Sequence, residues 1–123
     1  DKARVRAFAQ DIACDLQPVT NLRILQSLKS DFEASSEQTE AWCVKWIEQA
    51  FSALEKRLVT RSGKYCVGYD VTLADVCLIP QVYNALRFKV NLQHFPLIQK
   101  IFDNCNELEA FQTAKPEAQS DSA

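Results

Sequence analysis

The chain contains almost no glycine. Among its 123 residues only Gly63 and Gly68 are glycines. Loops that wrap phosphate groups, and the tight turns that join the strands of a sheet, both depend on glycine. The sequence therefore excludes a phosphate-binding loop and favours helices over a many-stranded sheet.

Apolar residues recur every three or four positions over most of the chain, as on one face of an α-helix. The clearest such segment runs from about Glu37 to Val59, with Ser35 and Ser36 available as caps before it. Trp42 and Trp46 form a second apolar edge, for packing against a helix or for an interface. Charged residues are expected on the side of this helix opposite the apolar stripe: Lys45, Glu48, Glu55 and Lys56.

Proline divides the first apolar stripe, which covers residues 5–19. Pro18 has no backbone N–H and its ring clashes with the preceding turn, so the helix is expected to break or kink near Leu16 and Gln17. A second helix should follow over residues 22–32. The run at residues 64–71 has no partner with an alternating pattern and is expected to be an extended loop.

The segment VTLADV, residues 71–76, carries the signals of a helix start. Thr72 and Asp75 have the spacing of a capping box, and Val71 and Val76 that of a hydrophobic staple. We expect a helix that starts at Thr72 and is kinked at Pro80. Thr72 and Asp75 are thereby assigned structural roles.

Two further helices complete the predicted fold. One should begin at Pro96 and a short one should cover residues 107–114, ended by Pro116. The chain is thus predicted to be an all-α bundle of about six helices. Residues 1–115 would form its one domain and residues 116–123 a flexible tail.

The charges of the chain nearly balance, with 14 Lys and Arg against 16 Asp and Glu. No basic stripe offers itself to nucleic acid, and no apolar run approaches the roughly 20 residues that span a bilayer. The single histidine, His94, rules out a two-histidine metal site and is assigned to the helix start at Pro96. Nucleic acid, membranes and metals are not predicted as partners.

The chain has five cysteines at wide, irregular spacing: Cys14, Cys43, Cys66, Cys77 and Cys105. An odd number, without a Cys-x-x-Cys pair or a signal peptide, is typical of free thiols in a reducing compartment. We therefore predict a cytoplasmic protein.

Four blocks of the sequence resemble one protein family. The segment from Gly68 to Asp75 is similar to the G-x-x-x-T-x-A-D pattern in the C-terminal helical domain of cytosolic glutathione transferases. The blocks LQPVTNL at 16–22, PQVYNALRFKV at 80–90 and EAFQ at 109–112 resemble the zeta class, the maleylacetoacetate isomerases. The resemblance spans nearly the whole chain.

This resemblance implies an enzyme whose first, thioredoxin-like domain binds glutathione and activates its thiol through a Ser-Ser-Cys-type motif. That motif is absent from these residues, so no catalytic residue is assigned and the chain alone is expected to be inactive. The intact protein would be a homodimer that isomerises maleylacetoacetate to fumarylacetoacetate in tyrosine and phenylalanine catabolism, with a weaker transferase activity. Maleylpyruvate and related acids stay open as substrates, as does the presence of the first domain in the native chain.

The resemblance also implies site residues. Gln17, Asn21, Leu22 and Arg23 match positions that line the glutathione site, and Arg87 matches the arginine that orients the substrate. A guanidinium suits this role because it grips a carboxylate of a diacid in bidentate fashion. By their local chemistry alone, Gln17 and Asn21 are equally well explained as caps of a helix break.

Three residues depart from the pattern of the family: Thr20, Arg23 and Leu86. A second interpretation also stays open, in which the domain is a non-catalytic helical module that associates through the edge of Trp42 and Trp46. Without a partner domain, the chain is expected to expose apolar surface along its first helix and to self-associate.

Overall fold

Helices account for most of the computed structural model, which describes residues 1–122. The α-helices are α1 (Lys2–Gln10), α2 (Gln17–Thr20), α3 (Leu22–Phe32), α4 (Ser36–Arg61), α5 (Leu73–Arg87), α6 (Pro96–Asn106) and α7 (Glu109–Ala114). A π-helical segment covers Asp11–Leu16, and 3₁₀ turns cover Leu92–His94 and Pro116–Ala118. No strand occurs in residues 1–122, where an isolated bridge joins Ser62 and Gly68 in the loop before α5. The predicted all-α fold and extended loop are confirmed.

α1, the π-helical segment and α2 form one continuous rod that ends at Asn21, where the backbone becomes extended. The break expected near Leu16 and Gln17 is therefore wrong, and the helix is instead distorted into a π-helical turn that ends at Leu16. In a regular α-helix the Pro18 ring would clash with the carbonyl of Cys14. The turn before it is wider, with the Gln17 N–H donating to the Ile12 carbonyl, and this π-helical turn accommodates the ring.

The rod buries a residue at every fourth position: Phe8, Ile12, Leu16 and Thr20. Four residues turn a regular α-helix about 40° past a full turn, so such positions would drift around its axis. The wider π-helical turn offsets part of this drift. All four side chains are therefore buried on the inner side of the rod.

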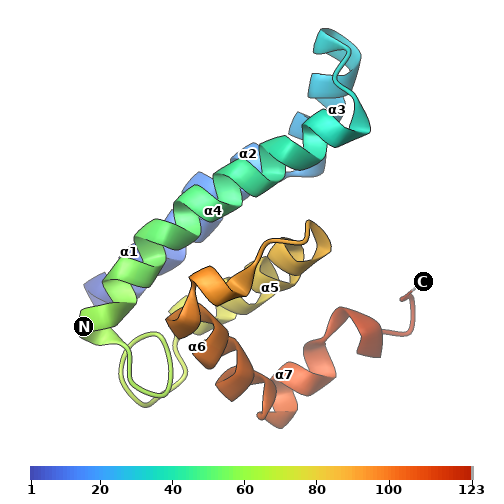
Figure 1. Ribbon diagram of the computed structural model, residues 1–123. Helices are drawn as coiled ribbons and strands as arrows, with labels where there is room; N and C mark the ends of the chain where they lie inside the picture. Colours follow the sequence, from blue (N-terminus) through green and yellow to red (C-terminus); the bar gives the residue numbers. More distant parts are fainter. Residues whose placement is uncertain (123) are drawn as a thin grey trace.

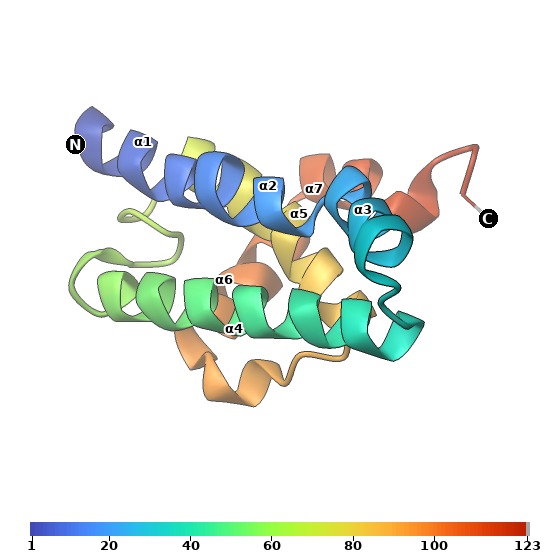
Figure 2. The same ribbon diagram turned by 90° about the horizontal axis from the view of Figure 1, so that it is seen from above.

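α4 lies beside the rod and runs in the opposite direction (Figures 1 and 2). Its start is a capping box, in which the Gln38 N–H donates to Ser35 Oγ at 3.1 Å and the Ser35 N–H donates to Gln38 Oε1 at 2.8 Å. The observed helix extends the predicted one by one residue at its start and two at its end. Local capping chemistry and periodicity were sufficient to place it.

Trp42 and Trp46 pack between α4 and the rod. Both are half-buried against the core, with ring centroids 5.6 Å apart in an edge-to-face pair. Trp42 Nε1 donates to the carbonyl of Val19 at 2.7 Å. The pair therefore serves helix packing, and the exposed edge expected for an association module is wrong because the rod covers it.

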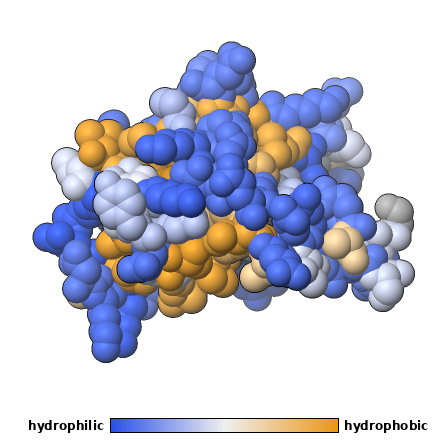
Figure 3. Space-filling model, turned by 90° about the horizontal axis from the view of Figure 1, so that it is seen from below, coloured by the Kyte–Doolittle hydropathy of each residue, from blue (hydrophilic) through white to orange (hydrophobic). Residues whose placement is uncertain are grey.

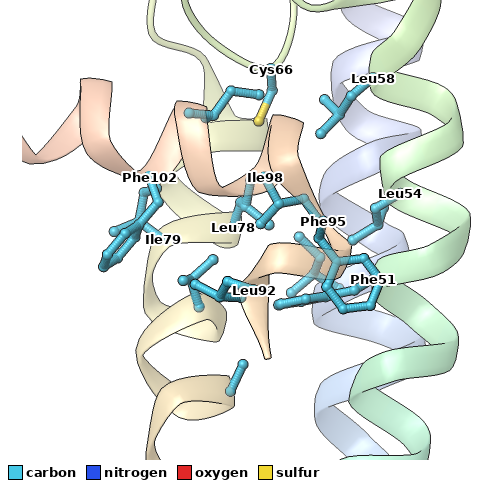
Figure 4. Close-up of a cluster of buried hydrophobic side chains, with 14 of the residues drawn as sticks. Phe51, Leu54, Leu58, Cys66, Leu78, Ile79, Leu92, Phe95, Ile98 and Phe102 are labelled. Atoms are coloured by element: carbon cyan, nitrogen blue, oxygen red, sulfur yellow. The ribbon is translucent and has the colours of Figure 1, made fainter. Parts of the chain in front are cut away.

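The core lies where α4, α5 and α6 meet, and Figure 4 shows its side chains. Phe51 of α4 and Phe95, which precedes α6, are both buried, with ring centroids 5.6 Å apart and nearly perpendicular planes. Further fully buried side chains surround them: Ile47, Leu54, Leu58, Leu78, Val82, Ile98 and Ile101. Each contributes about 1.5–3 kcal/mol through removal from water.

α5 begins after Thr72, as predicted, and continues past Pro80 without a break. The Thr72 N–H donates to Asp75 Oδ2 at 2.9 Å. Asp75 is fully buried, and its other oxygen accepts the Cys66 N–H at 2.9 Å and lies 3.9 Å from Cys105 Sγ. The predicted structural role of Asp75 is confirmed, and the same carboxylate also contacts the preceding loop and α6.

α6 begins at Pro96, as predicted. Its cap comes from α4, because the Glu55 carboxylate accepts the N–H groups of Leu97 and Ile98. The expected position of Glu55 opposite the apolar stripe is therefore wrong. Glu55 instead borders the apolar stripe of α4, four residues after Phe51 and three before Leu58, and reaches the start of a helix more than 40 positions away.

Exposed apolar side chains lie at the start of α5. Leu73 and Val76 are each 52% exposed, and Val71 is 39% exposed. Figure 3 shows apolar surface among charged side chains on one face of the molecule. In residues 1–122 no large exposed apolar side chain lies on the rod, so the predicted apolar surface along the first helix is wrong. The apolar stripe of the rod packs against α4 and α5.

Candidate functional site

A hollow of about 370 Å³ opens where the rod ends, between α2 and the middle of α5. It brings together Gln17 and Asn21, which were predicted as site residues, with Gln81 and Asn84 of α5, which were not. Thr20 and Pro80 complete the lining. None of these six side chains is charged, so the hollow offers mainly amide donors and acceptors.

The end of the rod positions Gln17 and Asn21. They stand four residues apart, the spacing that places two side chains on one side of a helix, and both are exposed. Asn21 Oδ1 accepts the Ile24 N–H at 3.3 Å and caps α3. The capping role is therefore confirmed for Asn21. Its Nδ2 donates to no other atom of residues 1–122 and stays available to a ligand.

Thr20 takes no such part. It is buried, and its hydroxyl donates to the Leu16 carbonyl one turn back along the rod at 3.1 Å. This hydrogen bond turns the hydroxyl away from a ligand. The departure from the family pattern at Thr20 thus supplies a contact within the rod.

Gln81 is the residue of the hollow that sequence reasoning missed. Its side chain is 1% exposed, yet neither Oε1 nor Nε2 has a hydrogen-bond partner in the described part of the chain. A buried polar group left unpaired costs about 1–3 kcal/mol. The available signal was one amide inside the otherwise apolar stretch VCLIPQV, residues 76–82.

The other predicted site residues stand outside the lining of the hollow. Leu22 and Arg23 follow Asn21 in the first turn of α3, and both are exposed. Arg87 is exposed in the last turn of α5, three residues beyond Asn84 and on the same side of the helix. The two ion pairs found within residues 1–122, Arg4 with Asp1 and Arg57 with Asp11, leave the guanidinium groups of Arg23 and Arg87 unpaired.

The buried thiols are poor nucleophiles. Burial, with the nearby Asp75 carboxylate as a second cause, raises the pKa of Cys66 far above its usual range and that of Cys105 to about 12. Burial also raises the pKa of Cys43. Because the thiolate is the reactive form, these cysteines are held protonated near neutral pH. No group of three His, Cys, Asp or Glu side chains in residues 1–122 is arranged to hold a metal ion, and none of the described helices could cross a membrane.

Comparison with known proteins defines the class. Residues 22–109 match the family of the glutathione S-transferase C-terminal domain. This match covers more than half of the chain, so the chain belongs to that family. The resemblance found in the sequence is confirmed.

The relatives matched by sequence have more specific names than the family as a whole. The chain is 43% identical over 121 residues to a probable maleylacetoacetate isomerase of Vibrio cholerae. It is 44% identical over 124 residues to a maleylpyruvate isomerase of a Ralstonia species. These matches take in 98% and 99% of this chain but only 56% and 58% of the two relatives. The chain thus spans somewhat more than half the length of the curated relatives it matches.

Solved structures agree. A holo structure of a bacterial maleylpyruvate isomerase, a zeta-class glutathione S-transferase, superposes with a TM-score of 0.96 at 45% identity, over 98% of this chain and 58% of that one. A maleylacetoacetate isomerase from Anaeromyxobacter dehalogenans, with glutathione bound in its active site, gives a TM-score of 0.92 at 33% identity, over 98% of this chain and 55% of that one. Both confirm the predicted fold of the glutathione transferase C-terminal domain.

Proposed function

We propose that this chain is the helical domain of a glutathione-dependent isomerase that converts a cis dicarboxylic acid to its trans isomer. The observation that carries the proposal is the hollow at the end of the rod. There Gln17 and Asn21 meet beside α5, whose last turn presents the unpaired Arg87.

The lining of the hollow fits part of a tripeptide such as glutathione. Amide side chains both donate and accept hydrogen bonds, as peptide groups do, and no carboxylate lines the hollow to repel an anionic ligand. Glutathione, when bound, supplies a thiolate whose reversible addition to the double bond of the substrate permits rotation about that bond. Gln17 and Asn21 hold the tripeptide at the break between α2 and α3. Leu22 and Arg23 contact it from the first turn of α3.

Arg87 binds a carboxylate of the substrate. Its guanidinium is exposed, has no acidic partner within residues 1–122, and lies about one turn from the hollow. A bidentate grip holds one end of the diacid while the other end rotates. In support, a related isomerase from A. dehalogenans binds dicarboxyethyl glutathione and citrate in its active site.

Maleylacetoacetate is the substrate that we propose, which places the protein in tyrosine and phenylalanine breakdown. Maleylpyruvate is the alternative substrate, because relatives of nearly equal identity are named as isomerases of one acid or of the other. We propose the cytoplasm as its compartment, because all five cysteines are free. By the pattern of the family, the intact protein would be a homodimer.

The test uses the protein produced from its native gene. Its mass is measured first, and then the rate of glutathione-dependent isomerisation of both acids by the unmodified protein, by Arg87→Ala and by the exposed control Lys100→Ala. We expect a mass of about 23 kDa, as for two ordinary domains. We also expect kcat/KM to fall at least about tenfold in Arg87→Ala, or about 1.4 kcal/mol, and to be unchanged in Lys100→Ala.

Two results would contradict the proposal. A native mass near the 14.0 kDa of this chain, without isomerase activity, would favour the non-catalytic module. Equal activity in Arg87→Ala and Lys100→Ala would remove the assigned role of Arg87.

A further inference from the structure

The side-chain carboxamide of Gln81 is buried and has no hydrogen-bond partner in residues 1–122. It lies in the wall of the hollow, directly after Pro80 on α5, and is 1% exposed. Both of its polar atoms lack a hydrogen-bond partner within residues 1–122. Since nearly all buried polar side chains in proteins are hydrogen-bonded, this amide requires an explanation.

Packing does not explain it. The buried neighbours of Gln81 along α5 are Leu78, Ile79, Val82 and Ala85, so an apolar side chain of similar volume would suit the position. Such a side chain would leave no polar atom unpaired. Packing alone therefore does not account for a carboxamide at this position.

The chemistry of the carboxamide restricts what that group is. Oε1 accepts and Nε2 donates, so a partner that satisfies both must present a donor and an acceptor side by side. A peptide unit does this. A carboxylate or phosphate only accepts, and would leave Oε1 unpaired.

We propose that Gln81 is a ligand-binding residue whose carboxamide turns into the hollow and forms paired hydrogen bonds with a peptide unit of the bound ligand. Nε2 would donate to the carbonyl of that unit, and Oε1 would accept its N–H. Asn84, three residues further along α5, lines the same hollow. The inference rests on the proposed function, in which glutathione supplies the peptide unit.

The experiment measures two quantities in the native-gene protein: the dissociation constant of glutathione by titration calorimetry, and the urea midpoint of the ligand-free protein. The variant is Gln81→Met, which keeps the length of the side chain and removes both polar atoms. The matched control is Gln10→Met, an exposed position on the rod. We expect Gln81→Met to raise the urea midpoint and to weaken glutathione binding at least about fivefold, while Gln10→Met changes neither.

The opposite results would overturn the inference. A lower urea midpoint in Gln81→Met would mean that the amide is already paired in the free protein, for instance with an enclosed water. Unchanged affinity would mean that the ligand does not reach it. If Gln81 were a purely structural residue, its replacement would lower both the stability of the protein and its affinity for glutathione.

A third variant, Gln17→Ala, separates this inference from the proposed function. If Gln17→Ala weakens glutathione binding and Gln81→Met does not, the proposed function stands and the role of Gln81 falls. If the unmodified protein does not bind glutathione, the proposed function itself falls, and the ligand assigned to Gln81 falls with it.

Discussion

The carboxylate of Glu55 accepts the backbone N–H of Leu97 at 2.6 Å. Its second oxygen accepts the N–H of Ile98 at 3.0 Å. The first N–H groups of a helix have no partner within the helix, and the positive end of the helix dipole favours a negative charge there. One side chain in the last third of α4 thus fixes the start of α6.

Removal of this cap should destabilise the protein. Glu55→Ala leaves two partly buried N–H groups without an acceptor, and we expect the free energy of unfolding to fall by about 2 kcal/mol. Urea unfolding followed by circular dichroism measures the change. The exposed Glu40→Ala, on the same helix, is the control. Equal midpoints for the two variants would show that the cap contributes nothing.

Asp75 should contribute more to the stability of the protein than its place in a capping box indicates. In Asp75→Asn the new NH₂ group must face either the Cys66 N–H or the Thr72 N–H, so one donor meets another. We expect a loss of about 2–3 kcal/mol in the free energy of unfolding. The exposed Asp70→Asn serves as its control. A loss no larger than in Asp70→Asn would contradict this role of the carboxylate.

Stability should fall at alkaline pH. Burial raises the pKa of Cys66 and Cys105, so the folded state keeps protons that the unfolded chain releases as pH rises through about 8.5. The unfolded state then binds fewer protons than the folded state, and the free energy of unfolding decreases. Urea midpoints between about pH 7.5 and about pH 9.5 test the sign. Cys105→Ala should reduce the dependence, and a midpoint that rises over this range would refute it.

The chain as given should self-associate through the start of α5. Leu73 and Val76 are half exposed and stand three residues apart on one side of the helix. The double variant Leu73→Lys, Val76→Lys should sediment as a monomer at concentrations where the unmodified chain does not. Val59→Lys alters an exposed apolar residue elsewhere and should leave association unchanged. A monomeric unmodified chain that binds no apolar dye would contradict this prediction.

Helix starts were predictable wherever the capping groups are neighbours in sequence. Ser35 and Thr72 mark two such starts, Pro96 marks the first position of α6, and the helix predicted over residues 22–32 is also observed. The cap of α6 by Glu55 was not predictable, because it joins two helices whose packing the local sequence does not specify. The form of the helix distortion before Pro18 was not predictable for a related reason. A proline that ends an isolated helix is accommodated here by a wider turn.

The candidate site was likewise predictable only in part. Gln17 and Asn21 were placed by the resemblance, and the structure brings them to one hollow. The contribution of α5 to that hollow was not visible, because Gln81 and Asn84 meet the rod only through tertiary packing. An amide within an apolar run is weak evidence until its burial is known.

Because of the π-helical turn, the register of the buried positions depends more on the number of residues in the rod than on the identity of its side chains. Buried positions four residues apart stay together only while the wider turn persists between them. Deleting one residue from Asp11–Leu16 would rotate the start of the rod by about 100° relative to its end. The apolar stripe of α1 would then lose its register with α5 while Gln17 and Asn21 kept theirs. Homologous proteins should therefore vary in side chains along this segment but keep its number of residues.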